Sequence, residues 1–234
     1  MPDPDAPLGI LMLDTRFPRP VGDGGNPLSY PFPAVVRRVE GASVARAVRG
    51  DPVVLLDAFI RGGEALVAQG CAAIVTTCGF LVPLQEALSR ALPVPIGTSA
   101  LTECVRVEVG LPPGQRVGVL SIAASALTPA HYRAARLAPD TPVGSLEGGA
   151  FARAILGNGT GLDMEAARRE HVAGARDLVA RHPEVGAIVL ECANMPPHAE
   201  AISQATGRPV HSILTLAARL REEALVGGES VGVL

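Results

Sequence analysis

The sequence lacks lysine and tryptophan and is poor in aromatic residues. All 20 of its Lys+Arg residues are arginine, and aromatic residues make up 3% of the chain. The absence of lysine excludes pyridoxal phosphate enzymes, which need a lysine Schiff base, and Walker-type phosphate loops, which need a lysine in the loop. No apolar run reaches the roughly 18 residues that span a bilayer, and the N-terminal stretch is acidic, unlike an export signal. We therefore expect a soluble, cytoplasmic protein.

The composition indicates a globular chain with a large apolar interior. Hydrophobic residues make up 48% of the 234 residues and charged residues 18%, and the mean hydropathy is +0.31. The formal net charge of −3 leaves no excess of positive charge for a phosphate backbone or an anionic membrane surface. Nucleic acid and membrane are therefore not expected as partners. The length suits one large domain or two lobes of about 100 residues each.

Four cysteines are present, at positions 71, 78, 104 and 192, and none forms a CxxC pair. In a reducing compartment such spacing does not predict disulfides or a zinc knuckle. The sequence is thus expected to need no structural metal.

Short Val/Ile/Leu-rich runs alternate with longer stretches of helical period, which predicts an α/β fold with parallel sheets flanked by helices. The predicted strands are Leu8–Leu13, Ala72–Thr77, Val94–Gly97, Arg116–Ser121, Val143–Leu146, Gly186–Glu191 and Pro209–His211. The predicted helices are Pro52–Gln69, Pro83–Ala91, Ser99–Val109, Ser125–Leu137, Asp163–Arg181, Pro196–Thr206 and Ser212–Leu225.

Residues 14–43 form a segment rich in proline and glycine, in which we expect no regular element. It follows the first strand and so leaves the sheet at the carboxyl edge, where α/β proteins bind ligands. A long loop in a compact domain is usually functional or disordered. The segment is therefore either a lid or pocket wall, or disordered.

The chain contains an internal duplication. A shift of 114 residues places Ala72–Ile96 over Gly186–Val210, with identities that include Cys78 over Cys192. Similar motifs, GILML at Gly9 and GVLSI at Gly118, open the two halves at a slightly different offset. We predict two related lobes, residues 1–110 and 111–234, with a C-terminal segment that packs back on the first lobe. Such an arrangement places the two matched cysteines across a shared cleft.

Cys78 and Cys192 each follow an apolar strand and precede a helix. Backbone N–H groups and the helix dipole at such a position favour a thiolate, so we expect thiol pKa values lowered toward neutrality. Most lone cysteines are small buried hydrophobes, and we interpret Cys71 and Cys104 in this way. The matched pair is suited to acid/base work. One sulfur can take a proton from an acidic carbon while the other delivers a proton from the opposite face, which inverts the carbon without a cofactor.

These two cysteine motifs and the duplicated layout resemble the aspartate/glutamate racemase superfamily of cofactor-independent enzymes. The superfamily includes glutamate, aspartate and hydantoin racemases, maleate isomerase and arylmalonate decarboxylase. The resemblance covers essentially the whole chain. It implies two α/β lobes with the active site between them, catalysis by Cys78 and Cys192, no cofactor, and a small carboxylate or carbonyl substrate. Related enzymes are often oligomeric, so a homo-oligomer is also an expectation.

The motif details differ from the amino acid racemases. Gly79-Phe80 follows the first cysteine where those enzymes have Asn-Thr, and Ala193-Asn194-Met195 follows the second, similar to the Ala-Gly-Met of hydantoin racemases. Phe80 offers an apolar wall, which favours a larger or less polar substrate than a small zwitterion. The main hypothesis is therefore a racemase or epimerase. Decarboxylation or cis–trans isomerisation of a malonate-like or maleate-like acid is the alternative within the superfamily.

Further residues are candidates for substrate binding because they lie at strand ends, at helix starts or in the long loop. They are Asp14, Asn26, Thr76, Thr77, Gly79, Phe80, Thr98, Ser99, Ser121, Ser125, Ala193 and Asn194. Their hydroxyl, amide or N–H groups could hold a carboxylate or stabilise an enolate. Helix capping explains the Ser and Thr residues equally well. Asp14 could equally form an ion pair with Arg16 or cap a turn.

Histidines leave two other classes open. His198 and His211 could approach the cleft, which would allow a Cys–His hydrolase or a Cys₂His₂ metal site. Neither has supporting spacing, so we expect His198 on a solvated helix face and His131, His171 and His182 at the surface. A ligand sensor that uses the cleft only for binding is the alternative outside enzymes.

Overall fold

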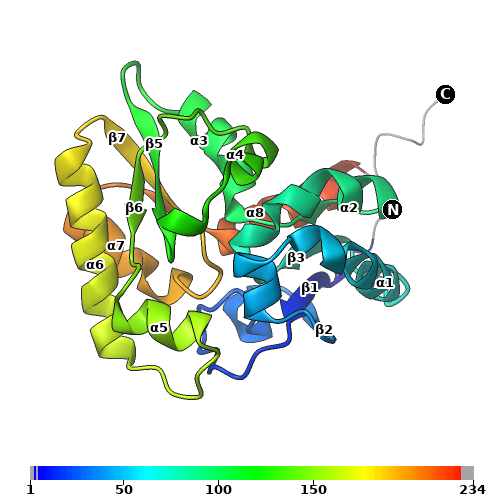
Figure 1. Cartoon of the computed structure of the whole chain (residues 1–234). Helices are drawn as coiled ribbons and strands as arrows, with labels where there is room; N and C mark the ends of the chain where they lie inside the picture. The colour runs from blue at the N-terminus through cyan, green and yellow to red at the C-terminus, as the bar shows by residue number, and fades with distance from the viewer. Residues whose placement is uncertain (1–2, 4, 228–234) are drawn as a thin grey trace.

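The computed structural model describes residues 3 and 5–227 as two parallel four-stranded sheets with helices on their faces (Figure 1). The first sheet has the order β2–β1–β3–β4 and the second has the order β6–β5–β7–β8. The strands are β1 (Leu8–Leu13), β2 (Ala34–Val39), β3 (Ala73–Thr76), β4 (Ile96–Gly97), β5 (Arg116–Ser121), β6 (Val143–Ser145), β7 (Val185–Leu190) and β8 (Val210–His211). The predicted α/β class is confirmed, and the matching strand orders show the duplication in three dimensions.

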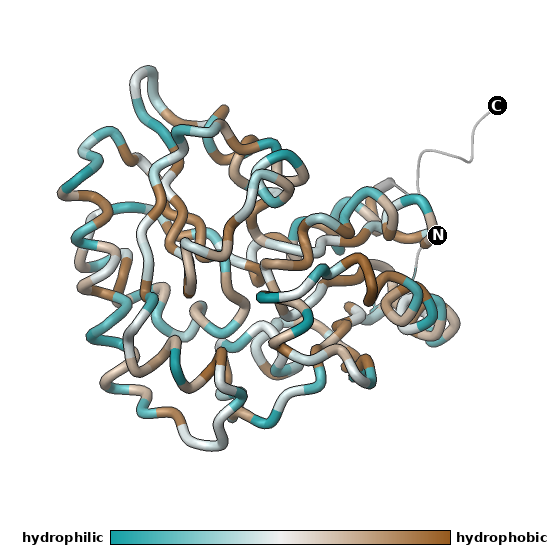
Figure 2. The backbone as a smooth tube through the Cα atoms, in the orientation of Figure 1, coloured by the Kyte–Doolittle hydropathy of each residue, from teal (hydrophilic) through white to brown (hydrophobic). Residues whose placement is uncertain are grey.

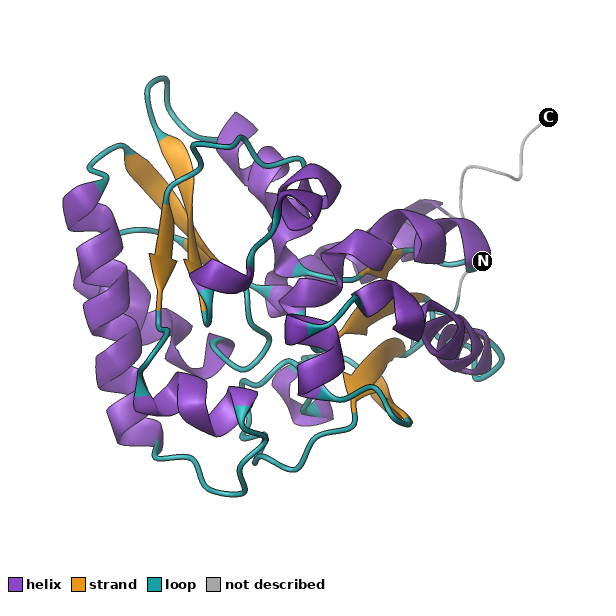
Figure 3. Ribbon diagram, in the orientation of Figure 1, coloured by secondary structure: helices purple, strands orange, loops and turns teal. Residues whose placement is uncertain are grey.

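The central strands β3 and β7 are almost entirely apolar because helices cover both faces of each sheet (Figure 3). Every residue of β3 and β7 is buried. All seven predicted strands are present, and β1 and β5 have the predicted bounds. The hydropathy colouring shows the apolar stretches gathered inside the molecule along these strands (Figure 2).

The prediction that residues 14–43 contain no regular element is wrong. The edge strand β2 (Ala34–Val39) pairs in parallel with β1, after the short 3₁₀ turn η1 (Pro27–Ser29). Pro33 precedes the strand and does not break it, because its carbonyl oxygen accepts from the N–H of Leu8 at 2.8 Å and no N–H is needed there. The β-branched residues of AVVRRV were the available signal.

The helices mostly begin with a 3₁₀ turn at the predicted start. They are α1 (Leu56–Val67), α2 (Gln85–Ala91), α3 (Cys104–Val109), α4 (Pro129–Ala135), α5 (Ala150–Leu156), α6 (Met164–Arg181), α7 (Ala199–Thr206) and α8 (Ile213–Gly227). The preceding turns are η3 (Pro52–Leu55), η4 (Gly79–Leu84), η5 (Ala100–Glu103), η6 (Ala124–Ala126) and η7 (Pro196–His198). Helix α5 and the π-helical turn η2 (Ala45–Arg49) were not predicted. Both are too short to show a clear helical period.

The two halves exchange their last helices. The segment η5–α3 follows β4 of the first sheet but packs on the second, where Leu101 and Val107 lie in one apolar cluster with Val119 of β5. Helix α8 follows β8 of the second sheet but packs on β3 and β4, with Leu216 in one cluster with Val75. Each sheet therefore has one face covered by the other half of the chain.

In the part of the chain that the structure describes, no helix is both long and apolar enough to cross a membrane. The candidate site lies at the carboxyl ends of the parallel strands, where the two sheets approach each other.

Candidate active site

Cys78 and Cys192 line one small cavity between the two sheets. Each lies two residues beyond a central strand, β3 or β7, and each is only 7% exposed. The cavity measures about 20 Å³, room for about one water molecule. Its lining comes from both halves: Leu13, Phe17, Val44, Val48, Thr77, Cys78, Gly79, Phe80, Ile122, Ile155, Leu156, Glu191, Cys192 and Asn194. The walls are thus largely apolar, and no arginine lines them.

Segments that the chain inserts after β1 and before α6 close the cavity. Phe17 from the long loop and Ile155 of α5 both line it. The N–H of Arg16 donates to Oδ1 of Asn158, just after α5, at 2.7 Å and so joins the loop of one half to the other half. The loop after β1 is therefore a pocket wall, one of the two outcomes expected for it.

Both thiols are more weakly acidic than the sequence suggested. Burial raises the pKa of Cys78 to about 12 and that of Cys192 well above its ordinary value. The N–H groups of Phe80 and Leu81, at the start of η4, do lower the pKa of Cys78 as a helix start should, but the loss of water outweighs them. The expectation of thiol pKa values near neutrality is therefore wrong.

A chain of hydrogen bonds supports Cys192. Its Sγ donates to Oδ1 of Asn194 at 3.4 Å, and Nδ2 of Asn194 donates to Oδ2 of Asp23 at 2.6 Å. Asp23 is 1% exposed, and its Oδ1 accepts from Arg19 and from the N–H of Gly25. The long loop thus fixes the side chain of Asn194, whose oxygen accepts the hydrogen bond from Cys192.

Glu191, the last residue of the predicted strand Gly186–Glu191, is a third titratable group at the cavity. Its side chain is buried, and Oε2 accepts from Ser121 Oγ at 3.1 Å and from the N–H of Ile122 at 3.3 Å. Oε1 has no hydrogen-bond partner among the residues that the structure describes. Burial raises the pKa of Glu191 to about 7, and its charge raises the pKa of both Cys78 and Cys192. The available signal was an acidic residue directly before a matched cysteine.

Four of the six other candidate residues at the two cysteine motifs line the cavity. These are Thr77, Gly79, Phe80 and Asn194. Thr76 instead donates to the carbonyl oxygen of Thr98 at 2.7 Å and accepts weakly from the N–H of Cys78, so it holds the cysteine loop in place. Ala193 accepts from the N–H of Gly24 through its carbonyl oxygen.

The remaining candidates lie away from the cavity lining. Asp14 forms an ion pair with Arg38, Asn26 caps η1, and Ser125 is exposed and bonds to Glu147. Thr98 bonds to Gln85, Ser99 caps η5, and Ser121 bonds to Glu191. The distinction is geometric, because a strand end directs only some of its side chains toward the neighbouring sheet.

The expectation of surface histidines is wrong for three of them. His131, His171 and His198 are buried, and the rings of His171 and His198 lie 4.3 Å apart beside Phe151. None of the three lines the cysteine cavity. Within residues 3 and 5–227 no group of three or more His, Cys, Asp or Glu is placed to hold a metal ion.

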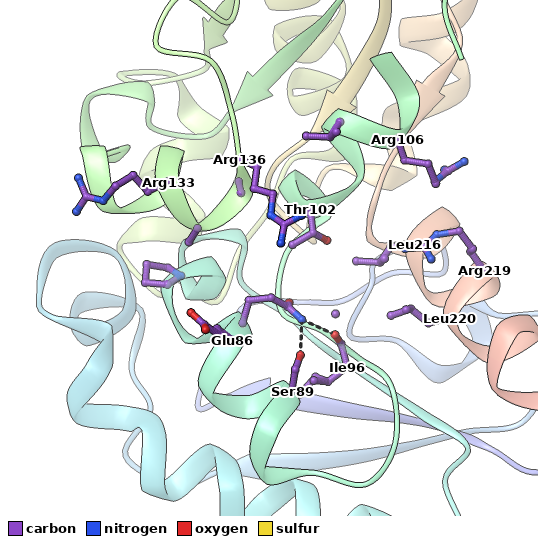
Figure 4. A pocket seen from close by; sticks show the side chains of 16 residues that line it. Glu86, Ser89, Ile96, Thr102, Arg106, Arg133, Arg136, Leu216, Arg219 and Leu220 are labelled. Carbon is purple, nitrogen blue, oxygen red and sulfur yellow. Dashed lines mark hydrogen bonds between the residues drawn. The ribbon is translucent and has the colours of Figure 1, made fainter. Parts of the chain in front are cut away.

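A larger cavity of about 680 Å³ lies elsewhere, between α2, α3, α4 and α8 (Figure 4). Arg106, Arg133, Arg136 and Arg219 line it, and Arg106 and Arg219 are held by the buried Glu103. Neither cysteine of the matched pair belongs to it. The larger cavity is therefore not the candidate site, because Cys78, Cys192 and Glu191 all line the small one.

Comparison with known proteins gives relatives of two kinds. No family model matches the chain. It is 27% identical to a dimethylsulfoniopropionate lyase of Durusdinium sp. clade D over 91% of the chain and 73% of that protein. It is 28% identical to dimethylsulfoniopropionate lyase 5 of Emiliania huxleyi over 89% of the chain but only 44% of that protein.

Similar solved structures include a mutant of arylmalonate decarboxylase and two racemases. The decarboxylase has a TM-score of 0.63 at 16% identity and covers 95% of the chain and 94% of its own. Allantoin racemase from Pseudomonas fluorescens gives 0.59 at 17%, over 94% and 92% of the two chains. Glutamate racemase from Francisella tularensis gives 0.57 at 15%, over 98% and 84%. The chain shares the fold of these decarboxylase and racemase structures, so the predicted resemblance is confirmed at the level of the fold.

Proposed function

We propose that this chain is a carbon-acid enzyme in which Cys78 and Cys192 move a proton at the carbon next to a carboxylate or carbonyl group of a small substrate. One observation carries the proposal. The two cysteines come from equivalent strand ends of the two halves and line the same small cavity. A buried sulfur on each side of a bound carbon is the arrangement that removal of a proton on one face and delivery on the other requires.

Racemisation or epimerisation is the outcome that two sulfurs favour. One sulfur breaks the C–H bond and takes the proton, which leaves a planar enolate. The other sulfur gives its proton to the opposite face, and the configuration is inverted. No cofactor is needed for this sequence, because both protons move between carbon and sulfur.

Elimination is the second candidate, and the lyase relatives favour it. Loss of a proton next to the carboxylate of dimethylsulfoniopropionate leaves an electron pair beside the carbon that bears the sulfonium. That pair forms the C=C bond, and dimethyl sulfide leaves with the electrons of the C–S bond. The apolar side chains of Phe17, Phe80 and Ile155 at the cavity suit such a methyl-bearing group better than an amino acid ammonium. The lyase reaction needs one base and shares its first step with racemisation.

The proposal is tested by proton NMR of the protein in D₂O. The substrates are single enantiomers of amino acids and 5-substituted hydantoins, together with aryl- and alkylmalonates, maleate and dimethylsulfoniopropionate. Loss of the α-proton signal without a new compound indicates racemisation or exchange. Acrylate with dimethyl sulfide indicates elimination, and fumarate or a decarboxylated acid indicates the other superfamily reactions.

Matched cysteine variants complete the test. Cys71 and Cys104 are buried like the pair but lie outside the cavity lining. Cys71→Ala and Cys104→Ala should keep the activity, whereas Cys78→Ala with Cys192→Ala should remove it. Turnover by the variant that lacks both cavity cysteines, or no turnover of any substrate by the wild type, would contradict the proposal.

A further inference from the structure

The two halves of the chain differ at one position of the site. The offset that aligns the cysteines places Thr77 over Glu191. In the first half, the N–H of Leu13 at the end of β1 donates to Thr77 Oγ1 at 3.1 Å. In the second half, the N–H of Ile122 after β5 donates to Glu191 Oε2 at 3.3 Å. The Thr77 hydroxyl and the Glu191 carboxyl thus accept equivalent hydrogen bonds from the neighbouring strand ends. Only the carboxyl has a second oxygen that this hydrogen bond does not use.

That second oxygen is held at the cavity without a partner. Ser121 and Ile122 fix Oε2, while Oε1 is buried and accepts no hydrogen bond from any of residues 3 and 5–227. Oε1 faces the residue that follows Cys78, because a Cβ at Gly79 would lie 2.3 Å from it. The hydrogen bond between the strand ends uses only Oε2, so it does not explain why Oε1 is buried at the cavity. Its position points to a role for the carboxyl beside the first cysteine.

The two thiols have different surroundings. The N–H groups of Phe80 and Leu81 favour the thiolate of Cys78, and the positive charge of Arg19 favours it too. Cys192 has one such N–H group, that of Asn194, but it also uses its proton as the donor to Asn194 Oδ1. Cys78 is thus placed to lose its proton and Cys192 to keep one.

We propose that Glu191 is the proton acceptor for Cys78, so that Cys78 is the base and Cys192 the acid of the resting enzyme. This inference rests on the proposed function and deepens it. The structure gives no hydrogen bond between Cys78 Sγ and Glu191 Oε1, so the two side chains must first approach each other. The Sγ–H bond of Cys78 then breaks, the proton binds to Oε1 of Glu191, and the negative charge moves from the carboxylate to the sulfur. The thiolate then takes the substrate proton, forming a new S–H bond as the C–H bond breaks. Glu191 is a positioning residue here, because it acts on substrate only through Cys78.

The transfer is uphill, because the pKa of Cys78 is about 12 and that of Glu191 about 7, so the thiolate is a minor form of the pair. The Glu191 carboxylate opposes ionisation of both thiols, so a second negative charge beside it is unfavourable. Moving the proton within the Cys78–Glu191 pair keeps the charge of the pair at one. Since the pKa of Glu191 is about 7, the carboxyl is able to accept a proton at neutral pH.

The inference is tested without substrate by alkylation of Cys78 with iodoacetamide from pH 5.5 to 9, followed by peptide mass spectrometry. When a pair shares one proton, the fraction with the thiolate rises about tenfold per pH unit until the carboxyl ionises and is then constant. In the wild type we expect the rate to rise to about pH 7 and then to level off. In Glu191→Gln the rate should continue to rise through pH 7.

Two variants guard against a purely structural effect. Ser121→Ala removes a hydrogen bond that lowers the pKa of Glu191, so the break in the profile should move to higher pH. This second variant keeps the test valid if Glu191→Gln does not fold. Glu200→Gln changes an exposed glutamate in the same way and should leave the profile of the wild type. The inference is overturned if the alkylation rate of the wild type does not level off near pH 7, or if it levels off at the same pH in Glu191→Gln.

Turnover separates this inference from the proposed function. With a substrate found by NMR, the acid limb of kcat/KM should lie near pH 7 in the wild type and be lost in Glu191→Gln, with Glu191→Asp partly restoring it. No turnover by the wild type together with a Glu191-dependent alkylation break would contradict the function and keep the proton acceptor. Turnover with no such break would keep the function and reject the acceptor.

Discussion

The backbone of Gly79 packs closely against Glu191 where the two halves of the chain meet. A Cβ on residue 79 would lie 2.3 Å from Oε1 of Glu191 and 2.4 Å from its carbonyl oxygen. The residue after one cysteine therefore contacts the residue before the other. The fit of the two halves at the cavity depends on the absence of a side chain at position 79.

Gly79→Ala should therefore disturb the site directly. One of the contacts is to backbone, which cannot turn away as a flexible side chain could, so the two cysteine loops must separate. We expect a loss of about 1–3 kcal/mol in the free energy of unfolding and a larger relative loss of activity. Urea denaturation and the NMR assay measure the two effects. Gly161→Ala, at a glycine with open space around it, is the control and should change neither.

The two cysteines should differ when replaced singly. In Cys192→Ser the thiolate of Cys78 still removes and returns a proton on its own face. This variant should exchange the α-proton of one enantiomer with D₂O but not invert it, and it should keep any elimination activity. Cys78→Ser should lose roughly 10²–10⁴-fold in exchange, the usual contribution of an acid/base group. Equal losses in both variants would contradict the assignment of roles.

Glu191→Gln should stabilise the protein at high pH. The folded pKa of Glu191, about 7, lies above its ordinary value of 4.5, so folding favours the neutral acid. The contribution of Glu191 to stability is fully present below pH 4.5 and is lost as the pH rises through 7. The isosteric amide has no charge to bury, so the variant should gain up to about 3 kcal/mol over the wild type at pH 8 and nothing at pH 4.5. Urea unfolding at both pH values checks this, and a pH-independent difference would count against a titrating Glu191.

The His171–His198 pair should make the protein sensitive to acid. Burial, and then the neighbouring His198, lower the pKa of His171 to about 3 from 6.5. A neutral histidine thus contributes stability that is present above pH 6.5 and is lost as the pH falls toward 3. At pH 5 the loss from this residue is about 2 kcal/mol. Thermal melts of His171→Leu should vary less with pH from 7 to 5 than those of the wild type, and equal slopes would show that another group titrates.

The apolar periodicity and the duplication were sufficient to predict seven of the eight strands and the meeting of Cys78 and Cys192 at one cavity. Both signals depend on burial, and β3 and β7 are buried on both faces, so their sequences are unambiguous. Strand β2 was missed because it lies at a sheet edge and has two exposed arginines. Its pairing with β1 is a tertiary effect that local composition does not show.

The chemistry of the site was predicted less well than its position. The position of a cysteine after a strand predicts N–H donors, and these are present at Cys78. The same position does not reveal how much water the other half of the chain removes, and that desolvation decides the thiol pKa. Glu191 was missed for a related reason, since only the packing of Gly79 against it shows that its carboxyl is buried at the cavity.

Because η5–α3 and α8 each cover the sheet of the other half, neither half of the chain has a complete core by itself. A single half would leave one face of its own sheet bare and carry a helix with no sheet to cover. Two such halves on separate chains would satisfy each other as a swapped dimer. In this protein the two partners are joined in one polypeptide. That linkage frees each copy to change independently, and the carboxyl at position 191 opposite the hydroxyl at position 77 is a difference that a symmetric dimer of identical chains could not have.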